Sequence, residues 1–247
     1  RFAVVCSSEI VRRRLIERGV PPELSVVIRP GVDFQLINRY RRSDLRATLG
    51  PSRDDFVVVL PEPLARAGGQ FEGGRAACFR HQVAGDVWIL VPGRSDERRR
   101  LGRFAATVPG AGGFVMAGGH HPFEALLCAS DALLITPRGD FSTTSIAWAM
   151  GAGVAVVGTA VHCVAELIAH KVNGLLFKQV RGRSLSASAV GLLLDRASQR
   201  RAAETARGQA YEVFGLRRYA EQMMRLYDNV LRGVAPGEGI VDSAAVM

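Results

Sequence analysis

Four consecutive hydroxyl residues, at positions 142–145, follow an apolar run at 132–136. They stand where that run gives way to a helical pattern, so they fall in the first turn of the expected helix. Unpaired backbone N–H groups and the helix dipole make such a terminus an anion site, and hydroxyls can donate to phosphate oxygens. Ordinary N-capping explains one of the four. The pattern therefore favours phosphate contacts from Ser142, Thr143 and Thr144.

Two further candidates follow other apolar runs. Gly118 and Gly119 allow close approach of the backbone to a ligand, and His120 could stack on or hydrogen-bond to a base. A polar turn is the commoner explanation of this segment. Metal binding by His120 and His121 is disfavoured, because the side chains of adjacent residues rarely point the same way. Glu166 begins a short helix, where it lines a nucleotide or simply complements the helix dipole.

The elements that must position these residues alternate between strand and helix. Apolar runs of strand length lie at 2–6, 25–28, 56–60, 86–91, 113–117, 132–136, 154–157 and 174–177. Helical patterns lie at 9–18, 43–49, 74–84, 95–108, 123–129, 142–150, 164–170, 184–195, 199–213 and 216–231. Such alternation predicts an α/β fold with a doubly wound, Rossmann-like parallel sheet, and ligands bind such sheets at the carboxyl ends of the strands.

Composition agrees with this fold class and restricts the partners. The 247 residues are 48% hydrophobic and only 7% aromatic, which suits parallel sheets covered by helices. The net charge of +9 comes almost wholly from arginine, because Lys171 and Lys178 are the only lysines. No basic stretch is interleaved with stacking aromatics, so we interpret the arginines as solvated helix faces and expect no nucleic-acid partner. A peripheral attraction to anionic lipid head groups or phosphorylated substrates remains open.

Cysteine usage and hydropathy indicate the compartment. The four cysteines are widely spaced and form no C-x-x-C pair, as in a reduced, cytoplasmic protein. There is no signal peptide and no apolar run long enough to span a bilayer. The chain starts with Arg1 directly before a strand-like run, so we expect it to be part of a longer protein.

Six short segments occur in a characteristic order. They are GVP at 19–21, VIRPGVD at 27–33, ASDALLITP at 129–137, AMGAGVAVV at 149–157, ELI at 166–168 and NGLLF at 173–177. In this order they resemble the retaining family 4 glycosyltransferases of GT-B architecture, over about residues 6–231. No single segment is decisive, but their order is fairly specific.

The resemblance implies two Rossmann-like domains that face each other across a cleft. One binds the acceptor, and the carboxy-terminal one, to which most of this chain corresponds, binds a nucleotide-diphosphate sugar. Residues 1–42 would be the last βα unit of the acceptor domain plus the interdomain link, 43–232 the nucleotide-sugar-binding domain, and 233–247 a flexible tail. The rest of the acceptor domain is the expected partner, and the helix at 216–231 is expected to pack back across the hinge.

The resemblance also assigns site residues and exposes departures. Paired glutamates of the family align with Asp140, which would orient the sugar as the catalytic carboxylate, and with Trp148, which cannot accept hydrogen bonds from a ribose. The phosphate-binding Arg and Lys of the family align with Glu62 and Ala67, although Arg66 stands one position away and could replace the lysine.

Two functions therefore stay open. The first is a glycosyltransferase that transfers a sugar from a nucleotide diphosphate to a saccharide or lipid-linked acceptor, in polysaccharide biosynthesis, without a metal or another cofactor. It would act in the cytoplasm or at the inner face of the membrane, and this part of the chain alone would be inactive. The alternative is a catalytically inactive, glycosyltransferase-like binding or scaffold module.

Overall fold

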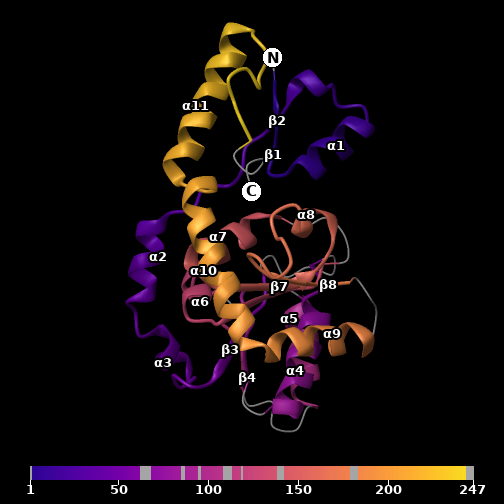
Figure 1. The fold of residues 1–247 in the computed structure, drawn as a ribbon, viewed down its shortest axis with the longest axis vertical. Coiled ribbons are helices and arrows are strands. Elements are labelled where there is room, and N and C mark those ends of the chain that lie inside the picture. Colours follow the sequence, from indigo (N-terminus) through magenta and orange to yellow (C-terminus); the bar gives the residue numbers. More distant parts are fainter. Residues whose placement is uncertain are drawn as a thin grey trace.

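The computed structural model describes residues 2–61, 68–84, 87–93, 96–107, 113–117, 119–137, 142–178 and 183–242. Its described strands form two parallel sheets, one small and one large (Figure 1). The small sheet pairs β1 (Val4–Cys6) with β2 (Ser25–Val27), and α1 (Glu9–Glu17) and the 3₁₀ turn η1 (Pro22–Leu24) connect them. The large sheet contains β3 (Phe56–Val59), β4 (Val87–Leu90), β5 (Phe114–Val115), β6 (Ala132–Ile135), β7 (Ala155–Thr159) and β8 (Leu175–Phe177).

The large sheet has the strand order β5-β4-β3-β6-β7-β8, with all neighbours parallel. Numbered from its first strand, this is the order 3-2-1-4-5-6 of a doubly wound Rossmann sheet. The prediction of a Rossmann-like α/β fold is confirmed. The winding direction reverses between β3 and β6, so the topological switch point lies between these two strands.

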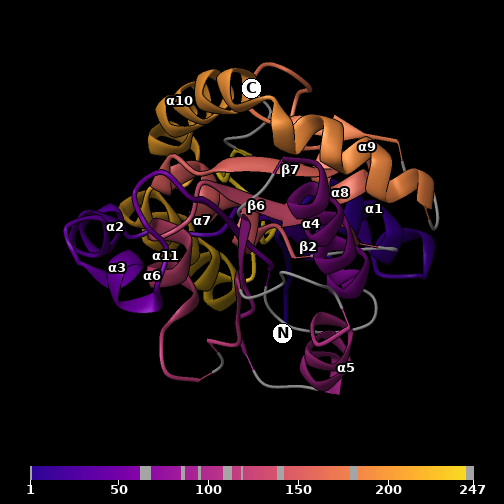
Figure 2. The same ribbon diagram turned by 90° about the horizontal axis from the view of Figure 1, so that it is seen from below.

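Helices cover both faces of the large sheet (Figure 2). One face carries α2 (Phe34–Arg41), α3 (Leu45–Leu49), α6 (Phe123–Cys128), α7 (Thr144–Ala152) and α10 (Arg196–Val213). The other face carries α4 (Gln70–Ala84), α5 (Asp96–Ala105) and α9 (Arg183–Leu194). In β3, Val57 and Val59 join the first core, whereas Phe56 and Val58 join the second. Burial on both faces explains why this strand is apolar throughout instead of alternating.

The helix α2 lies in a part of the chain where the sequence patterns indicate no helix. The Asp33 carboxylate accepts hydrogen bonds from the N–H groups of Gln35 (2.9 Å) and Leu36 (3.0 Å), so it caps the helix. Ile37 is buried against the large sheet's core. An aspartate followed by apolar residues at helical spacing was the signal for this helix.

The last helix, α11 (Leu216–Arg232), leaves the large sheet and packs along the small one (Figure 1). The chain crosses between the two parts at β2–α2 and again at α10–α11, and the two crossings touch: Val32 N–H donates to the Phe214 carbonyl at 2.6 Å. In place of the free tail expected from residue 233, residues 233–242 fold back along α11. Asn229 donates to the carbonyls of Pro236 and Glu238 and so holds this turn.

Candidate functional site

The switch point lies between the carboxyl ends of β3 and β6, the place where open α/β sheets bind their ligands. Beyond β6, the buried Thr136 hydroxyl donates to the Gly69 carbonyl at 2.6 Å, which fixes the residue before α4. Gly69 has a φ of +68°, and a Cβ built on it would overlap the Thr136 carbonyl oxygen. Only glycine therefore lets the start of α4 come this close to β6. The positive end of the α4 dipole is thereby held beside the switch point.

A second helix terminus, that of α7, follows β6 at the same edge. Ser142 and Thr144 are exposed there: the Ser142 hydroxyl lies 3.0 Å from the Thr144 hydroxyl and accepts the Thr144 N–H at 3.3 Å. Thr143 is buried instead, and its hydroxyl donates to the Ser7 carbonyl at 3.3 Å. Of the three hydroxyls predicted to bind phosphate, two face solvent and one joins the large sheet's domain to the loop after β1.

Glu166, directly after α8 (His162–Ala165), caps the start of α1 across the interface. Its carboxylate accepts the N–H groups of Glu9 at 2.7 Å and Ile10 at 3.1 Å. It thus complements a helix dipole, as the sequence allowed, but the helix is α1 and not its own. Glu166 and Thr143 together bring the carboxyl edge of the small sheet against the carboxyl edge of the large one.

A buried arginine completes this interface. Arg29, only 2% exposed, pairs with Glu166 at 2.5 Å and binds Asp242 through Nε at 2.7 Å and Nη2 at 2.5 Å. It also donates to the Ser7 carbonyl at 3.3 Å. Burial by itself lowers the pKa of Arg29, but the Asp242 and Glu166 carboxylates outweigh it and raise the pKa above its ordinary value. The guanidinium thus stays charged and links three separate segments.

Sequence patterns single out neither Arg29 nor Asp242, because their partners lie far away along the chain. The one available signal is the charged Arg29 between the apolar strand β2 and Pro30. A charge in such a place is almost always paired. Its partners become visible only in the folded structure.

Of the remaining predicted site residues, the structure describes Gly119 and His120. Gly119 and His120 form an exposed turn beyond β5, with a φ of +82° at Gly119. Trp148, a residue of α7 that aligns with a family glutamate, is half-buried and packs against the hydrophobic core. Asp140, Arg66 and Gly118, together with Glu62 and Ala67, lie outside the described residues.

Two arginines of α5 add positive charge near this edge. Arg98 donates to the Met116 carbonyl at 2.9 Å, just beyond β5. The Arg100 guanidinium lies over the ring of Phe71, 3.9 Å from its centroid, in the first turn of α4. Helix termini and arginine side chains of this kind attract phosphate groups. The edge can therefore receive an anionic ligand.

The described residues contain neither a metal centre nor a membrane-spanning helix. Nowhere among them do three His, Cys, Asp or Glu side chains gather closely enough to bind a metal ion. None of the described helices has the length and apolarity needed to cross a membrane.

Several solved structures have the same architecture as this chain. HepE of Anabaena, solved with UDP and glucose, superposes with a TM-score of 0.79 at 22% identity and covers 92% of this chain and 63% of its own. Sucrose-phosphate synthase of Thermosynechococcus elongatus gives 0.74 at 20% identity over 94% of this chain and 59% of its own. This chain has the fold of the corresponding part of these GT-B proteins.

A third neighbour, WaaG, described as a glycosyltransferase of lipopolysaccharide biosynthesis, gives a TM-score of 0.73 at 18% identity over 89% of this chain and 61% of its own. The chain thus spans less than two thirds of the length of each of these proteins. No family model and no curated protein matches the sequence. The likeness therefore shows the fold, and it bears out the resemblance inferred from the order of the sequence segments.

Proposed function

We propose that this chain is the donor-binding part of a glycosyltransferase and binds a nucleotide-diphosphate sugar. The observation that carries the proposal is the arrangement at the switch point: α4 begins against the end of β6, and Thr143, just before α7, contacts the loop after β1. Switch-point crevices are where open α/β sheets bind their ligands. HepE, which has the same fold, was solved with UDP-glucose, which supports a nucleotide sugar as the ligand class.

In this proposal the exposed hydroxyls of Ser142 and Thr144 donate to the diphosphate, and Asp140 orients the sugar. Arg66 supplies charge to the leaving diphosphate, while Gly118, Gly119 and His120 line the base. Thr143 and Glu166 act differently from the sequence-based expectation: Thr143 contacts the loop after β1 and Glu166 contacts the start of α1, so they join the two sheets. An acceptor domain, of which β1, α1 and β2 are the last part, would bind a saccharide or lipid-linked acceptor in the cytoplasm.

A specific observation favours the alternative, a glycosyltransferase-like module without activity. Trp148 stands where the resembling family has a ribose-binding glutamate, and its ring is engaged in packing. The two functions differ in whether the carboxyl edge of the large sheet, at the switch point, binds a nucleotide sugar. Binding is therefore the quantity to measure first.

The experiment is a thermal-unfolding panel of this chain with UDP, GDP, ADP and their sugars. A ligand at a hundred times its Kd stabilises the folded state by about 2.7 kcal/mol, or roughly 5–10 °C in Tm for a chain of this size. Thr144→Val should weaken the binding of the active ligand about 10-fold or more, because it removes a hydrogen bond to a charged group.

The matched control is Thr205→Val, which changes another exposed helical threonine on α10, whose hydroxyl bonds to the Arg201 carbonyl. This control should leave the affinity unchanged. If no nucleotide or nucleotide sugar raises Tm at millimolar concentration, the transferase proposal fails and the inactive module takes its place.

A further inference from the structure

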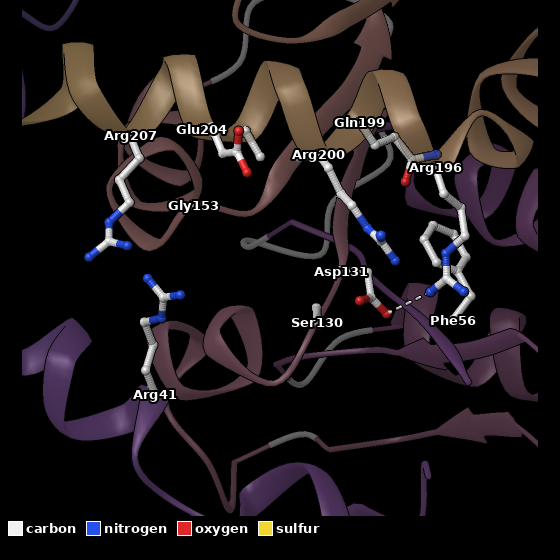
Figure 3. A pocket seen from close by; sticks show the side chains of 12 residues that line it. Arg41, Phe56, Ser130, Asp131, Gly153, Arg196, Gln199, Arg200, Glu204 and Arg207 are labelled. Carbon is white, nitrogen blue, oxygen red and sulfur yellow. Dashed lines mark ion pairs between the residues drawn. The ribbon is translucent and has the colours of Figure 1, made fainter. Parts of the chain in front are cut away.

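A pocket lies at the amino edge of the large sheet, opposite the switch point's ligand-binding edge, where β3, β6 and β7 begin (Figure 3). It is a cavity of about 350 Å³. Its floor includes Phe56 at the start of β3, Asp131 just before β6 and Ala155 at the start of β7. A volume near the lower end of the range for ligand pockets suits a small molecule and not a polymer.

One face of α10 forms the wall of this pocket. Arg196, Arg200, Glu204 and Arg207 recur at helical spacing and therefore project to the same side. Arg41, at the end of α2, enters from the opposite wall, and Figure 3 shows the Arg41 and Arg207 guanidinium groups pointing toward one another. Four arginines thus surround two carboxylates.

One of these carboxylates is already neutralised. Asp131 pairs with Arg46 at 3.3 Å and with Arg196 at 3.7 Å, and it accepts the Val57 N–H at 2.8 Å. Within the part of the chain that the structure describes, the side chains of Arg41, Arg200 and Arg207 make no hydrogen bond or ion pair. The pocket therefore holds three uncompensated cations and a single uncompensated acid, Glu204.

Helix dipoles do not account for all of these cations. The carboxyl end of α7, capped by Gly153, lies beside Arg41 and Arg207: a Cβ built on Gly153 would be 3.9 Å from Arg41 Nη1 and 3.2 Å from Arg207 Cδ. Its partial negative charge can attract one cation. Arg200, one turn from the positive start of α10, has no such reason to face the cavity.

The spacing of the charges indicates the ligand. Arg200 and Arg207 are seven residues apart, or about 10 Å along the helix axis. Glu204 lies between them and can accept a hydrogen bond from a hydroxyl group, whereas it would repel a continuous chain of phosphates. We propose that this pocket binds a small molecule with two phosphate groups on a hydroxyl-bearing spacer, such as a sugar bisphosphate. One phosphate contacts Arg41 and Arg207, and the other contacts Arg200.

Isothermal titration of the chain with a hexose bisphosphate, and with tripolyphosphate for comparison, tests the proposal. The ionic strength should be physiological, where charges more than about 8 Å apart are largely screened. We expect saturable binding of the hexose bisphosphate, tighter than that of tripolyphosphate. Glu204→Gln should narrow or reverse this preference, because it removes the charge that repels a phosphate chain.

A pair of charge-matched double variants locates the site. Arg200→Gln with Arg207→Gln should weaken hexose bisphosphate binding at least ~10-fold, because charge-assisted hydrogen bonds are lost. Arg201→Gln with Arg217→Gln removes the same charge from exposed positions outside the pocket and should change the affinity by less than about twofold. Far-ultraviolet circular dichroism should show that both variants are folded.

Three outcomes would overturn the proposal. They are no binding of either the hexose bisphosphate or the vesicles described next, an equal loss of affinity in the two double variants, and tighter binding of tripolyphosphate than of the hexose bisphosphate. Cosedimentation with vesicles that carry phosphatidylinositol bisphosphate distinguishes a lipid head group from a soluble sugar phosphate as the ligand. If only the vesicles bind, and binding is lost with Arg200→Gln and Arg207→Gln, the ligand is a lipid head group and not a soluble sugar phosphate.

Discussion

Removing the charge of Arg29 should destabilise the whole interface between the small and large sheets. In Arg29→Met the methionine fills part of the volume of the arginine stem, but Glu166 and Asp242 lose their shared cation. Breaking a buried ion pair by removing one partner costs about 3–5 kcal/mol. Glu166 keeps its two N–H donors from α1, and both carboxylates are partly exposed, at 15% and 22%, so we expect the lower end, about 3 kcal/mol.

For a chain of this length that loss corresponds to a fall in Tm of roughly 6–12 °C. Thermal unfolding at neutral pH, followed by circular dichroism, measures it. The control is Arg232→Met, because Arg232 and Asp228 form an exposed pair at 3.7 Å on α11. Exposed pairs contribute at most about 1 kcal/mol, so this variant should unfold close to the unmodified protein.

A double-mutant cycle separates the ion pair from general packing. Asp242→Asn alone should destabilise the chain, and Arg29→Met with Asp242→Asn should cost less than the sum of the single changes. The two residues are in direct contact, so we expect a coupling of about 1–3 kcal/mol. If the Tm of Arg29→Met matches that of Arg232→Met, or the two single changes are additive, the interface does not depend on this ion pair.

Three further predictions concern local features. Gly69→Ala should lower the free energy of unfolding by more than about 2 kcal/mol in denaturant titrations, because its Cβ would meet the Thr136 backbone at a positive φ. Gly208→Ala, in the middle of α10 where a Cβ meets no other atom, should raise the free energy of unfolding by up to about 1 kcal/mol. Hydrogen bonds from Ser52, and then from the Trp88 indole, lower the pKa of Asp55. The stabilising effect of Asp55 is therefore complete above its ordinary pKa and is lost as the pH falls through the folded-state pKa. The Tm of Asp55→Asn should accordingly fall less in acid than that of the unmodified chain, and thermal unfolding followed by the fluorescence of Trp88 and Trp148 measures it. Burial raises the pKa of the Cys78 thiol to about 12, so this thiol should react with a disulfide reagent at pH 8 only after unfolding, and fast labelling of it in the native protein would contradict the structure.

The fold was largely predictable because its signals are local. The run FVVVL at 56–60 is apolar throughout, as a strand buried on both faces requires, and the structure places β3 at Phe56–Val59. Helix boundaries were less predictable. The start of α4 at Gln70 lies four residues before the expected position, because a glycine pair at 68–69 reads as loop unless its contact with Thr136 is known.

In the candidate site, too, local features were predictable and distant contacts were not. Hydroxyls in the first turn of α7 and an acid at Glu166 were visible in the sequence, together with two chemically sensible roles for each. Residue type and spacing define what a side chain can donate or accept, but not which distant atom it meets. The folded chain directs Thr143 to Ser7 and Glu166 to the start of α1, while it leaves Ser142 and Thr144 in solvent.

By itself, the sequence determined a parallel α/β sheet, the position of its carboxyl-end loops and the chemistry available there, because hydrophobic periodicity and turn residues act over a few positions. Only the tertiary structure decided which charges are paired. Arg29 is neutralised because two crossings of the chain bring β2, Glu166 and Asp242 together. Arg200 and Arg207 remain uncompensated because α10 lies over the amino ends of the strands, where Asp131 is already paired with Arg46 and Arg196.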